Sequence, residues 1–224
     1  MQQFPYYSPQ ILTDAVFTQY GGQTGTSSAN QRQAAYLFAE EQMTENLSAF
    51  LVPTTITGSA WYRNGTLFET EFGYIRNIKH VSARVLEDVN PLDTQIYTGT
   101  ALIRNAENGY IDILFPNTTS SNYWVGIVYD VSVVYESGLS SGTVTSPVML
   151  SALTKAAQIH LNEWDASLAN EGSSDVGIES FSNQSYAEKR KFLGNTIFGN
   201  SPAAQYIARV TRKYRAKPTI GLHR

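Results

Sequence analysis

The spacing of apolar residues changes twice along the chain, and this constrains the fold more than any other feature. From Asn30 the apolar residues recur every three or four positions, which is typical of a helix with one buried face. From Thr54 to about Gly142 they alternate with polar residues, which is typical of half-buried strands. The helical spacing returns at Pro147. This order predicts an α+β protein in which a β-domain is inserted into a helical unit.

The first helix is predicted to run from Asn30 to Leu51, with Pro53 ending it. Three glutamates fall largely off its apolar stripe: Glu40, Glu41 and Glu45. The stripe itself consists of Tyr36, Ala39, Met43, Leu47 and Phe50. The residues before this helix are rich in glycine, serine and threonine, which predicts a flexible approach to it.

Two further helices begin with the same pair of residues, a serine that can cap the helix and a proline at its first position. One begins at Ser146 and is closed by Gly172, and its stripe comprises Leu150, Leu153, Ala157, Leu161, Trp164 and Leu168. A short extended segment, Val176 to Phe181, separates it from the last helix, which begins at Ser201. The last helix has an apolar side of Ala203, Ile207, Val210 and Tyr214. Because the two long helices have no partner nearby in sequence, we expect them to pack against each other.

The alternating region predicts an antiparallel sheet folded into a small sandwich or barrel. Turn-forming dipeptides such as Asn64-Gly65 and Asn108-Gly109 separate its strands. The expected strands are 54–62, 71–78, 81–87, 94–103, 110–115 and 123–135. The predicted divisions are an N-terminal arm (1–29), a helical ring-forming domain (30–53 plus 146–215), an inserted β-domain (54–145) and a basic tail (216–224). Helices and strands do not alternate here, so a doubly wound nucleotide-binding fold is not expected.

Positive charge is concentrated at the C-terminal end. Residues 188–224 hold nine of the sixteen lysines and arginines against one acid, Glu188, which gives a net charge of +8. Residues 1–187 hold seven bases and eighteen acids, a net charge of −11. A basic arm of this kind is attracted to an acidic partner or to nucleic acid, whereas an acidic body repels nucleic acid. The charge distribution favours a protein partner, and a simple solvated helix face remains an alternative.

The residues that catalysis requires do not converge in this sequence. There are no cysteines, and the three histidines are scattered at positions 80, 160 and 223. His160 is expected to be a hydrogen-bonded histidine at the edge of a helix. No zinc-binding spacing and no nucleophile elbow occur, and Glu69 with Glu71 and Glu87 with Asp88 flank predicted turns as solvated charges. We therefore expect no enzymatic activity, no metal and no cofactor.

No part of the chain has the features of a membrane segment. Residues 1–9 lack the basic and apolar regions of a signal peptide, and no apolar run approaches the roughly 18 residues that a membrane span needs. We expect a soluble protein that is made in the cytosol and contacts no membrane. The glycosylation sequons are then expected to be accidents of composition: Asn46, Asn64, Asn117 and Asn183.

Aromatic residues in the β-region allow a second functional class. Exposed aromatic side chains are used by saccharide-binding and receptor-binding sites, although tyrosine and tryptophan are also common in sheet cores and subunit interfaces. The residues with this potential are Trp61, Tyr62, Tyr74, Tyr97, Tyr110, Tyr123, Trp124, Tyr129 and Tyr135. We expect most of them in the core or in an interface, with Trp61, Tyr62 and Trp124 as candidates for an interface.

Four segments together resemble the head-tail connector, or adaptor, proteins of tailed bacteriophages. Gln33–Glu41 with Leu47 is similar to the opening helix of that family, and Ala152–Ala157 with Trp164 is similar to its second long helix. Gly177–Tyr186 resembles its short strand, and Lys213–Arg215 resembles the basic end of its last helix. These segments cover about half of the chain and occur in the family's order. Compact connectors are almost wholly helical, but adaptors of some short-tailed phages resemble a helical unit with an inserted β-domain.

The resemblance implies a virion protein of the neck, made in the host cytoplasm and located between capsid and tail. It implies a homo-oligomeric ring, usually of twelve copies, that continues the DNA channel below the portal protein without binding DNA sequence-specifically. The β-domain would reach toward a downstream tail or neck protein. The residues expected to dock on the portal are Arg209, Arg212, Lys213, Tyr214, Arg215 and Lys217.

Overall fold

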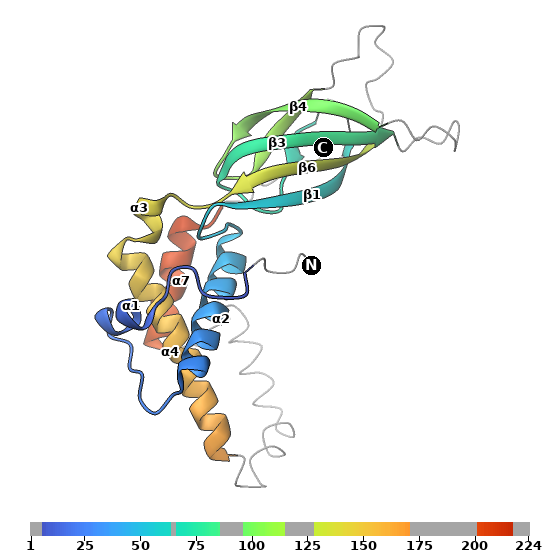
Figure 1. The fold of residues 1–224 in the computed structure, drawn as a ribbon. Coiled ribbons are helices and arrows are strands. Elements are labelled where there is room, and N and C mark those ends of the chain that lie inside the picture. Colours follow the sequence, from blue (N-terminus) through green and yellow to red (C-terminus); the bar gives the residue numbers. More distant parts are fainter. Residues whose placement is uncertain (1–5, 64–65, 86–95, 115–127, 171–200, 217–224) are drawn as a thin grey trace, which may run out of the picture. The chain divides into compact units, whose positions relative to one another are not determined.

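The computed structural model of this 224-residue chain describes residues 6–63, 66–85, 96–114, 128–170 and 201–216. Within these residues the fold is mixed α+β, with five helices and a six-stranded antiparallel sheet (Figure 1). The chain forms two compact units. The helical unit comprises Met1–Asn46 and Ser141–Tyr214, and the β unit comprises Leu47–Ser140 and Arg215–Arg224. The larger part of the β unit, Leu47–Ser140, is therefore inserted in the sequence of the helical unit, and its smaller part, Arg215–Arg224, follows that unit.

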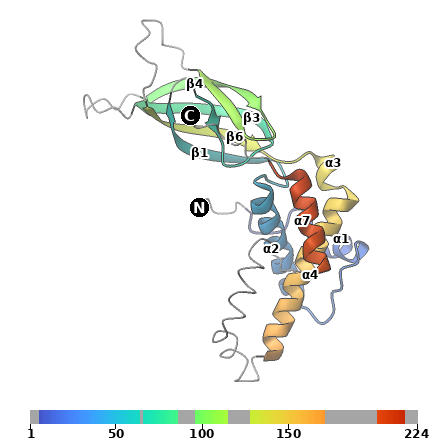
Figure 2. The same ribbon diagram turned by 180° about the vertical axis from the view of Figure 1, so that it is seen from behind.

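The helical unit contains α1 (Asp14–Gln19), α2 (Ala29–Leu47), α3 (Ser141–Val144), α4 (Pro147–Asn170) and α7 (Pro202–Tyr214). Both views show α2, α4 and α7 side by side (Figures 1 and 2). The apolar stripes predict that the two long helices pack against each other. Helix α4 packs chiefly against α7 instead, and α2 contacts α4 through residues outside the stripes: the Phe38 ring centroid lies 4.2 Å from that of His160 in an edge-on arrangement. The imidazole Nε2 of His160 also lies 3.3 Å from the Gln42 side-chain oxygen.

The predicted helix starts at Ser146 and Ser201 are confirmed. Each serine hydroxyl accepts a backbone N–H of the first turn, from Met149 at 3.4 Å and from Ala204 at 3.1 Å. Four of the six predicted stripe residues of α4 are buried: Leu150, Leu153, Ala157 and Leu161. The other two side chains, Trp164 and Leu168, lie outside the described residues, as do Gly172 and the expected segment 176–181.

The predicted end of the first long helix is wrong. All five expected stripe residues are buried, but α2 ends at Leu47 rather than near Pro53. The physical reason is Ser48, whose φ of 50° places it in the left-handed region that ends helices. The chain leaves the helix there, and Phe50 packs against Phe72 in the β unit at 4.5 Å between ring centroids.

Helix α1 was missed by the sequence reasoning, and it lies before the predicted approach to α2, the glycine- and serine-rich residues 21–28. Thr13 caps this helix by accepting the Val16 N–H at 3.3 Å. Asp14 receives a salt bridge from Arg32 at 2.8 Å and the Tyr36 hydroxyl at 2.8 Å. The Phe17 ring lies 5.0 Å from that of Tyr36. These contacts fix α1 against α2.

Glu40 departs most clearly from its predicted place off the apolar stripe, because its side chain is only 2% exposed. Its carboxylate accepts the backbone N–H groups of Gln10, Ile11 and Leu12 at 2.7, 2.8 and 2.7 Å. Burial raises the pKa of the Glu40 carboxyl, and these three hydrogen bonds oppose that shift. The carboxylate thus holds the segment before α1 on the surface of α2.

The β unit contains β1 (Thr54–Arg63), β2 (Phe68–Glu69), β3 (Ile75–Val85), β4 (Ile96–Asn105), β5 (Tyr110–Leu114) and β6 (Val128–Ser137). The strand order is β1-β6-β3-β4-β5-β2, and every neighbouring pair is antiparallel. The sheet curls into a nearly closed barrel (Figure 1). Its interior is filled by apolar side chains that include Ile56, Tyr62, Val81, Ala83, Ile111, Ile113, Val131, Val133 and Tyr135.

Two details of the strand prediction are wrong. The expected strands 71–78 and 81–87 are one continuous strand, β3, in which two register shifts, at Ile75/Asn77 and Ile78/His80, interrupt the alternation. His80 therefore lies within a strand rather than between two strands. The short β2 was not predicted, because two residues are too few to show an alternation. The first residues of the predicted strands 94–103 and 123–135 lie outside the described residues, so the predicted starts of β4 and β6 are not tested.

Candidate docking surface

Helix α7 presents two opposite sides. The buried side comprises Ala204, Ile207, Val210 and Thr211. Two residues predicted for this side, Ala203 and Tyr214, are half-buried. The buried Thr211 hydroxyl donates to the Ile207 carbonyl at 3.0 Å, so its polarity is satisfied within the helix. The apolar side thus faces the helical unit and leaves the other side to solvent.

The basic face of α7 consists of Arg209, Arg212 and Lys213, and all three side chains are exposed. Their spacing of three and four residues places them together on one face of the helix. Within the described residues, no carboxylate forms a salt bridge with any of them. Arg212 and Lys213 lie in the last turn, where the helix dipole favours cations. The face is therefore a cluster of positive charge without a carboxylate partner among the residues that the structure describes.

Most lysines and arginines of residues 1–187, unlike those of the basic face, form salt bridges. Four of the seven bases in residues 1–187 pair with carboxylates, and the pairs are Arg32–Asp14, Lys79–Glu136, Arg84–Asp130 and Arg104–Asp112. Three of these pairs join neighbouring strands of the β unit. Within residues 1–187 most bases are thus paired inside the fold, whereas the basic face forms no salt bridge among the described residues and can bind carboxylate or phosphate groups.

The other predicted docking residues are placed as follows. The Lys213 ammonium lies 4.9 Å from the ring centroid of Tyr214, the last residue of α7. Arg215 is exposed and belongs to the β unit. Lys217 lies outside the described residues. The helical unit therefore brings Arg209, Arg212, Lys213 and Tyr214 together on one helix end.

The structure describes two of the three predicted aromatic interface residues, Trp61 and Tyr62. Trp61 is 81% exposed on β1, whereas Tyr62 is buried and packs against Phe68 at 6.3 Å between ring centroids. Tyr62 is therefore a core residue, because the alternation of β1 turns it inward. Trp124 lies outside the described residues.

The histidines and carboxylates do not assemble a metal site in the described part of the chain. His160 is a hydrogen-bonded histidine at a helix contact, as predicted. Burial lowers the pKa of His160 to about 4, so the imidazole is neutral near pH 7. His80 is exposed on β3, and His223 and the Glu87–Asp88 pair lie outside the described residues.

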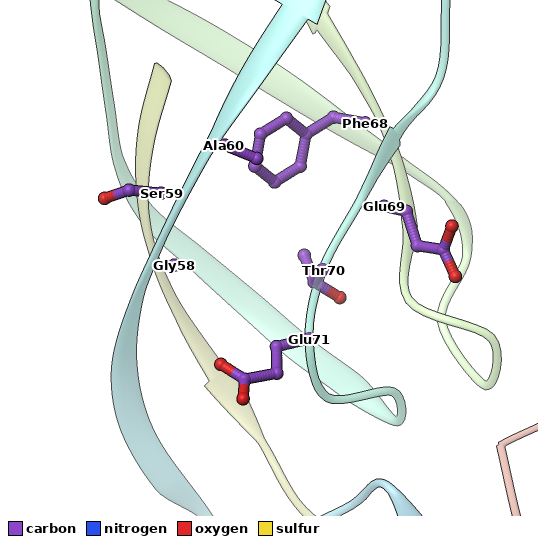
Figure 3. A pocket seen from close by; sticks show the side chains of 7 residues that line it. All are labelled: Gly58, Ser59, Ala60, Phe68, Glu69, Thr70 and Glu71. Carbon is purple, nitrogen blue, oxygen red and sulfur yellow. The ribbon is translucent and has the colours of Figure 1, made fainter. Parts of the chain in front are cut away.

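A pocket of about 350 Å³ in the β unit was missed by the sequence reasoning. Gly58, Ser59 and Ala60 of β1 line one wall, and Phe68–Glu71 line the other (Figure 3). Glu69 and Glu71 are exposed, as predicted, but both belong to this pocket. A run of three small residues in a strand otherwise rich in bulky ones was the only signal available.

Comparisons with models of protein families and with curated proteins find no match to this chain. Within the described residues, none of the helices combines the length and apolar character needed to cross a membrane.

Proposed function

We propose that this protein is a structural head-tail connector of a tailed bacteriophage, in which copies form a ring between the portal and the tail. The observation that carries the proposal is the basic face of α7, which forms no salt bridge within the described residues, on a chain whose residues 1–187 carry a net charge of −11. In this role the basic face docks on acidic groups of the portal. The inserted β unit reaches toward the next neck or tail protein.

The charge of the rest of the chain supports the same role. An acidic surface along a channel disfavours DNA condensation, so the genome passes without sticking to the wall. A ring of copies multiplies the basic face around the symmetry axis, and each copy adds to a combined affinity for a ring-shaped partner. A weak contact per copy is then sufficient for stable attachment.

The direct experiment is binding to the portal protein encoded in the same genome. Electron microscopy of the purified chain is expected to show rings, alone or after addition of portal rings. Reversing the basic face with Arg209→Glu, Arg212→Glu and Lys213→Glu is expected to abolish attachment while leaving circular dichroism unchanged. The control is Arg63→Glu, which reverses an exposed arginine of the β unit that forms no salt bridge within the described residues.

Two outcomes would overturn the proposal. The first is a monomer at high concentration that ignores the portal. The second is portal attachment that the basic-face variant retains in full. Attachment through exposed charges must also weaken as salt is raised from low to physiological concentration, because the screening length falls to about 8 Å at 0.15 M.

One observation favours a different class of function, a carbohydrate- or receptor-binding β-module. Trp61 is 81% exposed, and an exposed indole is a common platform for a sugar ring. Glycan-array binding that disappears with Trp61→Ala but persists with the basic-face variant would favour this alternative. Binding of duplex DNA with a steep salt dependence would instead favour a nucleic-acid-binding arm.

A further inference from the structure

The outer face of the barrel carries a row of four residues that lie side by side on neighbouring strands. Trp61 on β1 pairs with Asp130 on β6, and Asp130 pairs with Arg84 on β3. Arg84 in turn pairs with Ile96 on β4. The four strands run next to one another in the sheet (Figure 1). Directly paired residues of neighbouring strands lie only about 5 Å apart, so the four side chains form one continuous surface.

The side chains of this row point away from the barrel core. Successive residues of a strand face opposite sides of the sheet, and the residues next to the row along the strands are buried: Tyr62, Tyr129, Val131 and Ala83. Trp61 is 81% exposed and Ile96 is 71% exposed. The row is therefore accessible to a ligand.

The ion pair in the row keeps most of its polar atoms available. The Arg84 guanidinium lies 3.5 Å from the Asp130 carboxylate, and the two side chains are 55% and 41% exposed. Within the described residues these two groups form no hydrogen bond, whereas Arg104 donates one to Asp112 at 2.6 Å. Asp130 can therefore accept hydrogen bonds from a ligand while Arg84 donates them.

A second row, of small hydroxyl side chains, runs beside the first on the same face. It lies two positions away along each strand and consists of Ser59, Ser132, Ser82 and Thr98. The two central serines are half-buried, and the two outer residues are exposed. Small side chains leave room beside the indole for a flat ring, and each hydroxyl can donate or accept a hydrogen bond.

These features together match the chemistry of a neutral sugar. A pyranose ring has an apolar C–H face that packs on an aromatic ring, and its hydroxyls both donate and accept hydrogen bonds. The row offers an indole, an acceptor and a donor within two strand spacings, or about 10 Å. The charges of Arg84 and Asp130 offset each other, so the row favours a neutral sugar over an acidic one.

We propose that this row binds a neutral saccharide whose ring hydroxyls are equatorial, with Trp61 stacked on the apolar face of one sugar unit. Asp130 accepts hydrogen bonds from the hydroxyls of that unit, and Arg84 donates to those of the next unit. The hydroxyl row supplies further hydrogen bonds along one side of the saccharide. The inference deepens the saccharide-binding alternative, on which it rests, and is independent of the connector role.

The test is an NMR titration of the full-length protein with two neutral probes, cellotriose and triacetylchitotriose. The indole N–H signal of Trp61, assigned by its absence in Trp61→Phe, reports contact at the platform. We expect it to shift with a millimolar dissociation constant, so a titration to about 10 mM is sufficient. No shift with either probe would overturn the inference.

An acidic probe tests the assignment to neutral sugars. Trigalacturonic acid is expected to shift the Trp61 signal less than cellotriose does. A larger shift would show that the exposed guanidinium of Arg63, two positions from Trp61 on β1, dominates the surface. In that case the assignment to a neutral saccharide is wrong.

Matched variants locate the site, and the amide signals of the hydroxyl row report their affinities. Trp61→Ala should weaken binding about tenfold or more, whereas Trp61→Phe keeps a stacking face and should lose less. Asp130→Asn removes the charged acceptor and should weaken binding about fivefold. Its control is Asp112→Asn, because Asp112 also pairs with an arginine across two strands but lies opposite Leu102 rather than a tryptophan. Equal losses in the two asparagine variants would overturn the proposed location.

Portal attachment measured on Trp61→Ala keeps this result separate from the connector proposal. We expect the variant to lose saccharide binding and to retain attachment, because Trp61 lies outside the basic face. Loss of attachment in this variant would show that the row is a protein interface and would overturn the inference. Failure of the unchanged protein to attach, with saccharide binding intact, would count against the connector role alone.

Discussion

Replacement of Glu40 should show how strongly one buried carboxylate stabilises the helical unit. Its oxygens accept three backbone N–H groups from residues that are at least 28 positions away in the sequence. Of these donors, the Leu12 N–H is buried, whereas those of Gln10 and Ile11 are partly buried. An unsatisfied buried donor costs about 1–3 kcal/mol, and a donor that reaches water costs less. Glu40→Ala is therefore expected to lower the free energy of unfolding by about 2–4 kcal/mol.

Glu40→Gln offers a graded comparison. One carboxylate oxygen serves Ile11 and Leu12, and the other serves Gln10. An amide can keep the first oxygen but places an NH₂ group against the Gln10 N–H. The glutamine variant should therefore lose about 1–2 kcal/mol, less than the alanine variant. Glu45→Ala, an exposed position on the same helix, is the matched control and should change stability by less than about 0.5 kcal/mol.

Urea denaturation followed by circular dichroism measures these differences, and hydrogen exchange of the Leu12 amide reports the local effect. The Leu12 amide should lose its protection in Glu40→Ala but keep it in Glu45→Ala. The reasoning would be refuted if Glu40→Ala unfolded at the same urea concentration as Glu45→Ala. That result would mean that segment 10–12 is held by other contacts.

Three further predictions concern the backbone and pH. Gly73→Ala should destabilise the β unit by more than about 2 kcal/mol in thermal melts, because the new Cβ would lie 2.1 Å from the Glu107 carbonyl oxygen. Gly142→Ala is the control and should leave the melting temperature unchanged, because a Cβ there meets no atom within 4 Å. Ser48→Gly should raise the free energy of unfolding by about 0.5–1 kcal/mol, because glycine adopts the φ of 50° more readily; a lower urea midpoint would contradict this. The pKa of His160 is lowered by burial from 6.5 to about 4, so the unfolded chain binds the proton more tightly and stability should fall as pH drops from 6.5 through 4. His160→Asn should show a weaker pH dependence in this window than His80→Asn, and equal dependences would show that another group is responsible.

The elements that sequence reasoning predicted best are those whose signal is local. The starts of α4 and α7 follow from a serine and a proline at fixed positions, and a capping serine needs no tertiary context. The buried face of α4 follows from spacing alone. In the same way, the exposed bases of α7 could be predicted because charged side chains opposite an apolar stripe face solvent.

The errors arose where a distant segment decides the outcome. Glu40 is buried only because residues 10–12 supply three N–H groups to it, and nothing near Glu40 in sequence indicates this. The register shifts in β3 depend on its pairing with β6. The order of the strands in the sheet brings β1 beside β6, and topology of that kind cannot be read from alternation. Local pattern therefore identifies elements, whereas long-range pairing decides how they are used.

Ala216 fixes the chain within the β unit directly after the basic helix α7. Its N–H donates to the Leu47 carbonyl at 3.0 Å, and a Cβ on Gly73 would lie 2.7 Å from the Ala216 Cβ. Substitutions on the basic face share no partner with this anchor, so their effects and those of Gly73→Ala are expected to be additive. Loss of portal attachment in the basic-face variant and loss of stability in Gly73→Ala can therefore be assigned to different residues.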